Sequence, residues 1–426
     1  MQLFNPEVLN TGDTAWVLAS AALVLFMTPG LALFYGGMVR AKNILAMLMQ
    51  NFFSMGLVSI LWGVVGYTLA FGGDNPLIGN FDFFGMKDTA NYYPADDVGW
   101  FAAFTIPPLA FMAFQMMFAI ITPALITGAI ADRVKFHAWA WFLGLWAILV
   151  YSPVAHWVFS PSGWLFERGA LDFAGGTVVH INAGIAALAC VLVIGRRKGW
   201  PERPMPPHSL PFTLLGTGIL WFGWFGFNAG SSLLANGLGA QALINTHMAA
   251  AAAMLTWLIV ERIKTGHATT LGAASGAVAG LVAITPCAGF VGGIAPMIIG
   301  GVAGIVCFLA IQMKSKFGYD DSLDVIGVHL VGGIAGSILL AFFADPAVNA
   351  VVTEPGLFMT DGGTDLLIDQ LVAVGATLVF SFVMTFIIIK VLDLVIPGGV
   401  RVSEEDEEVG LDLTQHSETG YQLIER

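Results

Sequence analysis

Eleven long apolar segments dominate this chain of 426 residues and constrain its fold more than any other feature. A helix needs about 20 apolar residues to cross the hydrocarbon core of a bilayer. Only 11% of the residues are charged, whereas about 25% is usual in soluble domains. The sequence therefore predicts an all-α polytopic membrane protein with spans near residues 14–37, 44–71, 104–130, 136–154, 176–195, 210–233, 241–262, 269–286, 289–313, 325–344 and 367–396.

Basic residues in the loops predict how these helices are oriented. Lys and Arg residues gather in alternate loops, and the remaining loops carry only Lys87 and Arg168. Because basic loops stay in the cytoplasm, we expect the N-terminus outside and the C-terminus inside. We expect no cleavable leader, because no Lys or Arg precedes the first apolar run. The residues that carry this bias are Arg40, Lys42, Arg133, Lys135, Arg196, Arg197, Lys198, Arg203, Arg262, Lys264, Lys314 and Lys316.

We expect a transmembrane domain at residues 1–396 and a cytoplasmic tail at residues 397–426. The formal net charge is −12, and an acidic run occupies residues 404–408. This balance argues against a nucleic-acid partner. All three cysteines lie in apolar runs, which favours packing over disulfides or metal ligands, and we expect no cofactor. They are Cys190, Cys287 and Cys307.

A weak internal repeat relates the two halves of the predicted membrane domain. Residues 179–186 read VHINAGIA, and residues 328–335 read VHLVGGIA. The matched segments are five spans apart, so the corresponding helices run in opposite directions, as in transporters with a substrate site near the midplane. We therefore predict inverted five-helix repeats at about 14–195 and 210–344, followed by a final helix at about 367–396.

One ionisable residue recurs inside the membrane in both copies of this repeat, namely His180 in the fifth span and His329 in the tenth. The repeat predicts that the two residues converge near the midplane of the membrane and line a translocation path. The alternative is that each is a buried histidine bonded to a neighbouring helix. His247 has no repeated partner, so we interpret it as structural.

Asp172 precedes the fifth span. As a helix cap it would satisfy free backbone N–H groups, and its charge would also attract a cation to the mouth of the path. A cluster of aromatic residues outside the histidines would attract a cation through ring faces, although aromatic residues on membrane helices more often serve packing. The cluster comprises Phe114, Phe118, Trp221, Trp224, Phe225 and Phe227.

Five segments, DFAGGTVVHINAGIA, WFGWFGFNAGS, FYGGMVRAKN, ITPALITGA and GLDLTQHSETGY, resemble the Amt/Mep/Rh ammonium transporter family, bacterial Amt branch. The resemblance covers nearly the whole chain. It implies a non-enzymatic homotrimer in the cytoplasmic (inner) membrane, with one pore in each subunit. His180 and His329 match the family's twin pore histidines.

The resemblance also assigns roles at the outer mouth of the pore. Asp172 matches the acid that supports ammonium recruitment, and Ser231 matches a hydroxyl of that site. We also assign Phe118, Phe159 and Trp224 to it. Phe118 and Phe227 match a stacked phenyl gate below it.

Phe159 marks a departure from the family pattern. It stands where the family commonly has Trp, in HWVFSPS instead of a sequence like HWVWGGG. A phenyl ring is a weaker partner for a cation than an indole and has no N–H. Trp164 is a nearby alternative.

The expected mechanism separates ammonium from potassium by chemistry, because the two ions have similar size and charge. Ammonium donates hydrogen bonds and releases a proton, whereas an intact cation pays a large desolvation penalty in a dry pore. We expect recruitment, deprotonation and passage of ammonia along the imidazoles, with the route of the proton left open. The alternatives are an ammonium sensor with little transport, disfavoured by the short tail, and a neutral-gas channel of the Rh type, disfavoured by the Amt-like motifs.

The tail has two interpretations. Its polarity is compatible with a solvated, disordered end. The resemblance instead implies an ordered regulatory tail that packs on cytoplasmic loops, with Gly410, Asp412, His416 and Tyr421 within the matching segment. It also implies a regulatory partner, a PII-type signal protein that caps the inner pore mouths.

Overall fold

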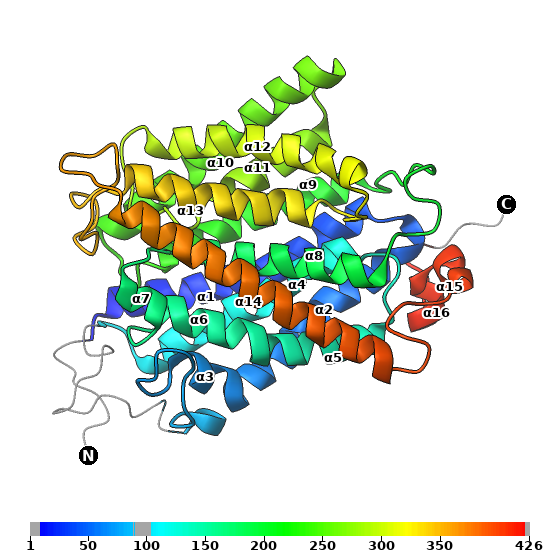
Figure 1. Ribbon diagram of the computed structural model, residues 1–426, viewed down its shortest axis with the longest axis horizontal. Coiled ribbons are helices and arrows are strands. Elements are labelled where there is room, and N and C mark those ends of the chain that lie inside the picture. Colours follow the sequence, from blue (N-terminus) through cyan, green and yellow to red (C-terminus); the bar gives the residue numbers. More distant parts are fainter. Residues whose placement is uncertain (1–8, 88, 90–103, 422–426) are drawn as a thin grey trace.

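The computed structural model describes residues 9–87, 89 and 104–421. The last five residues of the predicted tail and the first eight residues of the chain lie outside this part. Long helices run side by side along one direction, and two short helices, α15 (Glu404–Val409) and α16 (Leu411–His416), lie beyond one end of them (Figure 1).

The helices follow one another along the chain in two halves. In the first half they are α1 (Thr11–Met38), η1 (Ala41–Asn43), α2 (Ile44–Leu61), η2 (Trp62–Gly66), α3 (Tyr67–Phe71), η3 (Phe84–Met86), α4 (Pro108–Ile130), α5 (Phe136–Trp146), η5 (Ala147–Tyr151), α6 (Ser152–Phe159), α7 (Trp164–Arg168), η6 (Gly176–Ile181) and α8 (Asn182–Ile194). In the second half they are α9 (Leu210–Trp224), η7 (Phe225–Ala229), α10 (Gly237–Thr265), α11 (Thr270–Ile284), α12 (Ala295–Phe317), η8 (Ile326–Leu330), α13 (Val331–Phe343) and α14 (Asp365–Val395).

Length and hydropathy identify a multi-pass membrane protein. In the described ranges, ten helical segments are long and apolar enough to cross a membrane. The predicted span at 269–286 corresponds to α11, which is helical over only 15 residues. The helix stops before Pro286, which has no backbone N–H to continue it, and turns follow.

Both histidine motifs of the repeat begin with a π-helical turn. His180 lies in η6 and His329 in η8, and each turn continues into a regular helix, α8 or α13. Single π-helical turns inside α-helices are frequent at functional sites. The two turns contact each other, so the repeated motifs meet inside the bundle.

Two equivalent glycines permit this close crossing. A Cβ atom on Gly184 would lie 2.5 Å from the backbone nitrogen of Leu330, and one on Gly333 would lie 3.2 Å from the Cβ of His180. Small residues let membrane helices approach at backbone distance. The repeated sequence G-I-A therefore sets the separation of the two histidines.

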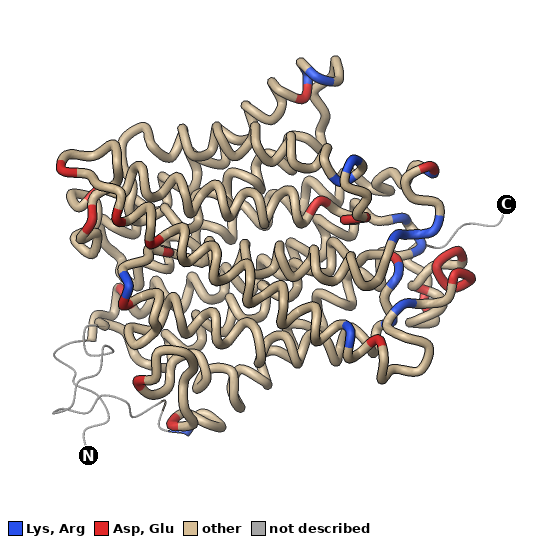
Figure 2. The backbone as a smooth tube through the Cα atoms, in the orientation of Figure 1, with Lys and Arg blue, Asp and Glu red and all other residues tan. Residues whose placement is uncertain are grey.

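Four basic or acidic loops converge at the end of the bundle that carries α15 and α16 (Figure 2). Arg40 pairs with Asp132 at 2.9 Å, and Arg197 lies 3.7 Å from the same carboxylate. Arg197 also pairs with Asp320 at 2.8 Å, and Arg133 lies 3.7 Å from Asp320. The loops that follow α1, α4, α8 and α12 are thus joined by one network of charges.

Candidate functional site

The two repeated histidines meet in the core of the bundle. Their Nδ1 atoms are 3.2 Å apart, and their rings lie 5.3 Å apart at an angle of 21°. Both side chains are buried, with 1% and 3% of the residue surface exposed for His180 and His329. One Nδ1 must carry a proton and the other must accept it, because two protonated or two bare nitrogens cannot form this bond.

A narrow apolar cavity adjoins the pair. Its free volume is about 10 Å³, which is room for about one water-sized molecule. The Nε2 atom of His180 has no hydrogen-bond partner among the described residues, so it is available to a molecule in this cavity. The lining comprises Met27, Leu31, Phe34, Ile121, Leu125, Val179, His180, Leu220, Trp224, Phe227, Val278 and His329.

Two phenylalanines separate this cavity from a second pocket. The rings of Phe118 in α4 and Phe227 in η7 are 4.3 Å apart and tilted by 38°. Both are buried, with 1% of their surface exposed. Phe227 also lines the cavity of the histidines, and Phe118 lines the second pocket.

The second pocket is wider and mostly aromatic, with a volume of about 200 Å³. It brings together three residues that the sequence assigned to recruitment, namely Phe118, Phe159 and Ser231. The Ser231 hydroxyl donates to the carbonyl of Phe227 at 2.8 Å, so its oxygen keeps accepting capacity. The lining comprises Phe104, Phe111, Phe114, Gln115, Phe118, Phe159, Pro161, Phe166, Phe173, Ser231 and Leu233.

Trp224 does not line this outer pocket, although the sequence placed it there. It lies on the histidine side of the phenylalanine pair, with its ring 5.5 Å from that of His180. Its indole N–H donates to the hydroxyl of Thr285 at 2.9 Å. The residue is the last of α9, three positions before Phe227 in η7. Trp164 does not line the pocket either, and its ring contacts Trp157.

Asp172 caps the turn that carries His180. Its carboxylate accepts from the backbone N–H groups of Gly175 at 2.7 Å, Gly176 at 2.7 Å and Thr177 at 2.8 Å, and from the Thr177 hydroxyl. It is not among the residues that line the outer pocket. The structure thus places Asp172 as a cap that fixes the start of η6. The backbone that it caps separates its charge from the outer pocket.

Asp321 makes the same contacts in the second repeat, and the sequence analysis missed it. It accepts from the N–H groups of Val325 at 3.1 Å and Ile326 at 2.7 Å, at the start of η8. The signal was present, because Asp172 precedes His180 by the same number of residues as Asp321 precedes His329. The repeat therefore begins at the capping acid.

Gln115 is a second residue that the sequence analysis missed. It lines the outer pocket, and its buried Oε1 atom has no hydrogen-bond partner in the described part of the chain. The pocket therefore offers a cation an amide oxygen as well as ring faces. No periodicity distinguishes one amide on an apolar helix, so only the fold identifies it.

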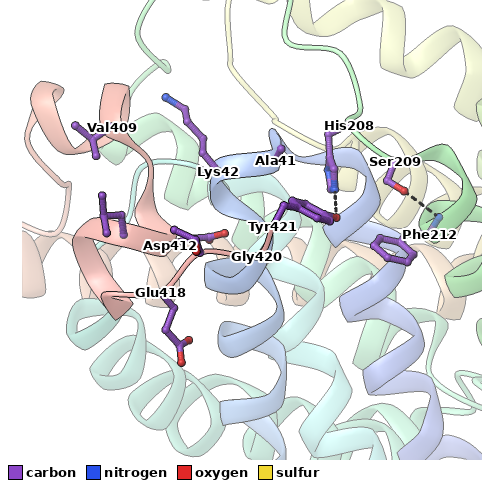
Figure 3. A pocket seen from close by; sticks show the side chains of 12 residues that line it. Ala41, Lys42, His208, Ser209, Phe212, Val409, Asp412, Glu418, Gly420 and Tyr421 are labelled. Atoms are coloured by element: carbon purple, nitrogen blue, oxygen red, sulfur yellow. Dashed lines mark hydrogen bonds between the residues drawn. The ribbon is translucent and has the colours of Figure 1, made fainter. Parts of the chain in front are cut away.

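The four predicted tail residues contact the loops and helices at the basic end of the bundle, and Figure 3 shows two of them, Asp412 and Tyr421. Asp412 accepts from the N–H of Ala46 at 2.9 Å, which caps α2. The ring of His416 packs 5.0 Å from Phe136, and Tyr421 bonds His208 at 2.7 Å. Gly410 has a φ of 115° and would place a Cβ 2.7 Å from the backbone oxygen of Lys42.

The arrangement favours passage over covalent chemistry. In the described ranges, no group of three or more His, Cys, Asp or Glu residues is placed to hold a metal. A wide aromatic pocket leads to a phenyl pair and then to a dry cavity with paired imidazoles.

Comparisons with known proteins identify the family of the chain. The model of the Ammonium Transporter Family matches residues 15–421. An ammonium transporter of Mycobacterium bovis is 50% identical over 97% of this chain and 91% of its own length. The crystal structure of Candida albicans Mep2 superposes with a TM-score of 0.87 at 34% identity, covering 95% of this chain and 89% of that one. A solved Sensor Amt Protein gives 0.85 at 30% identity, covering 95% and 98%. The chain belongs to the ammonium transporter family.

Proposed function

We propose that the chain conducts ammonia across a membrane after recruiting ammonium at the outer pocket. The single observation that carries this proposal is the order of the two cavities. The aromatic pocket has a volume of about 200 Å³, and the cavity beyond Phe118 and Phe227 has only about 10 Å³. A hydrated ion has room in the first cavity, whereas the second admits one small molecule.

The outer pocket selects for a cation. Ring faces attract a cation by about 0.5 to 2 kcal/mol, and the pocket offers seven phenylalanines along with Gln115 and Ser231. Phe159 supplies a phenyl face where the family commonly has an indole. Because the amide and hydroxyl oxygens accept hydrogen bonds, they favour ammonium over potassium.

The phenyl pair and the dry cavity oppose passage of the intact ion. Leaving water costs a charged group far more than a neutral one, so loss of a proton before the narrow cavity lowers the barrier. A neutral imidazole pair bonded through Nδ1 leaves one Nε2 as acceptor and the other as donor. Ammonia also donates and accepts, so it matches both atoms.

The proton that ammonium releases has two possible destinations. It either returns to the outer solution, which makes transport electroneutral, or follows through the paired imidazoles, which makes it electrogenic. The hydrogen bond between His180 and His329 supplies one link of such a relay.

The orientation and assembly complete the proposal. We assign α11 as an eleventh span, with the N-terminus outside and the tail inside a cytoplasmic membrane, because Lys and Arg gather at the tail end (Figure 2). Resemblance to the family supports a homotrimer and a PII-type partner on the same face.

Uptake and current measurements in liposomes that contain the purified protein test this function. Conduction predicts ammonium-dependent alkalinisation or current that saturates with concentration, and potassium should give none. The alternative, an ammonium sensor with little transport, predicts binding of ammonium without flux. Flux of potassium equal to that of ammonium would contradict the proposal.

A further inference from the structure

A second, strongly charged pocket lies at the tail end of the bundle, away from the proposed path. Its volume is about 360 Å³, within the range of small-molecule sites. The charged residues that line it come from three parts of the chain: the loop after α1, the loop after α8, and α15. They are Arg40, Lys42, Lys198, Arg203, Glu407 and Glu408.

Part of this charge is neutralised within the protein. Arg40 pairs with Asp132 at 2.9 Å, and Glu407 pairs with Arg401 at 2.7 Å. Both carboxylates are buried, with about 1% of each side chain exposed. Neither pair is available to a ligand without leaving a buried charge, which is strongly unfavourable.

Lys42 and Arg203 keep their charges. Among the described residues neither forms an ion pair, and the Lys42 ammonium donates to the carbonyl oxygens of Glu407, at 3.0 Å, and Glu408. Carbonyl groups satisfy its hydrogen bonds but do not cancel its charge. The Arg203 side chain is exposed and forms no hydrogen bond or ion pair in the described part of the chain. The pocket thus presents two cations that form no ion pair, with Glu408 as the nearby exposed acid.

Lys198 is a third cation, and the ion pairs that it forms contribute little stability. Its ammonium lies 3.1 Å from Glu404 and 3.0 Å from Glu408. The side chains of these two acids are 76% and 55% exposed, and exposed ion pairs contribute little stability. An anion that brings several oxygens can therefore replace them.

We propose that this pocket binds a phosphate group between Lys42 and Arg203, with Lys198 as a third ligand. A phosphate group, whether in a diester or a monoester, is an anion with at least two free acceptor oxygens, which matches the two cations that form no ion pair. Charge-assisted hydrogen bonds to such a group are stronger than neutral ones. Glu404 and Glu408 compete with the ligand for Lys198.

Two sources supply this chemistry at the cytoplasmic end of a membrane protein, namely a phospholipid headgroup and a soluble phosphate compound. The probes are phosphatidylglycerol, compared with phosphatidylcholine by native mass spectrometry, and labelled inorganic pyrophosphate, bound to the full-length protein in phosphatidylcholine nanodiscs. Selective binding of the first probe identifies a lipid site. Saturable binding of the second identifies a soluble ligand.

Three variants test the pocket. Arg203→Gln removes a cation whose side chain holds nothing else, and it should weaken binding of the effective probe about tenfold. The pair Glu404→Gln and Glu408→Gln removes the competing acids and should strengthen binding. The pair Arg262→Gln and Lys264→Gln, at the end of α10, removes two cations outside the pocket and should leave binding unchanged.

The comparison between variants decides the outcome, and all of them should show the monodispersity and ammonium uptake of the parent protein. Weaker binding in Arg203→Gln together with stronger binding in the acid variant supports the pocket. Equal losses in Arg203→Gln and in the α10 control would indicate general charge attraction and overturn the proposal, as would failure of both probes to bind.

Discussion

The Nδ1 atoms of His180 and His329 lie 3.2 Å apart, although 149 positions separate the residues in the chain. The bond requires one proton between the two nitrogens, so a change at either residue removes a partner from the other. A buried polar group that loses its partner costs about 1 to 3 kcal/mol. The two residues therefore behave as one functional unit.

Replacing His180 or His329 by Ala should reduce selective ammonium flux about tenfold, which corresponds to about 1.4 kcal/mol. The double variant should lose little more than either single variant, because the first change already removes the pair. Liposome uptake measures all three. The matched control is His247→Ala, because His247 packs on Trp221 and lines neither cavity. Full flux in the single variants would exclude the pair from the path.

The phenyl pair gives a second prediction. Replacing both Phe118 and Phe227 by Ala opens the 4.3 Å contact and should let water or ions reach the histidine cavity, so that ammonium selectivity over potassium falls. Current in the presence of each ion measures this change. Phe308→Ala is the control, because Phe308 is equally buried but packs on Trp257. It should lose about 3 kcal/mol of stability and keep its selectivity.

The membrane class and the repeat were predictable from the sequence because both depend on pattern. Apolar length alone separates spans from loops, and the repeated V-H and G-I-A letters mark equivalent helices. The first and last residues of each helix were harder to predict from the sequence. The predicted span at 269–286 is helical only from Thr270 to Ile284, because Pro286 ends a pattern that remains apolar.

The internal repeat predicted that the two histidines meet, and their Nδ1 atoms do lie within hydrogen-bonding distance. The phenyl pair, Phe159 and Ser231 were assigned only by resemblance to the family, and their roles stay predictions. Gln115 does not follow from the motifs, because its role depends on which helix face meets the pocket. The sequence assigned Trp224 to the outer pocket, whereas in the structure it lines the histidine cavity together with Phe227.

Asp172 provides a third prediction, which separates capping from charge. Asp172→Ala removes an acceptor for several donors and should abolish uptake, with a loss of about 1 to 2 kcal/mol typical of a cap. Asp172→Asn keeps one acceptor oxygen without the charge and should retain the fold but lose most uptake. Thermal unfolding and uptake, measured together, distinguish the effects. Wild-type uptake in the Asn variant would contradict the electrostatic contribution.

The equivalent acid, Asp321, gives a dependence on pH. Burial, and then the neighbouring Asp324 carboxylate, raise the pKa of Asp321 to about 6, whereas an unfolded Asp titrates near about 3.9. Between these values the folded protein binds more protons than the unfolded chain. The contribution of Asp321 to stability is therefore greatest below about pH 4 and is lost as the pH rises to about 6.

The measurement compares melting temperatures of the parent protein and Asp321→Asn between pH 4 and 7. The stability of the parent relative to the variant should fall as the pH rises. Asp324→Asn should move this fall to lower pH, because the repelling carboxylate is gone. A difference that stays constant across the range would show that Asp321 does not titrate there.

The docked tail gives the last prediction. Gly410 adopts a φ of 115°, and a Cβ there would lie 2.7 Å from the Lys42 backbone oxygen, so Gly410→Ala should release α16 from α2. Faster proteolysis after residue 409 would report release, and Gly375→Ala, on an open face of α14, is the control.

If a PII-type protein recognises the docked tail, its pull-down at low and high ATP and 2-oxoglutarate should weaken in Gly410→Ala and in a tail deletion. Binding that does not depend on the nucleotide, or that persists after the tail is deleted, would show that the tail does not take part in recognition. Either result would leave the transport proposal unaffected.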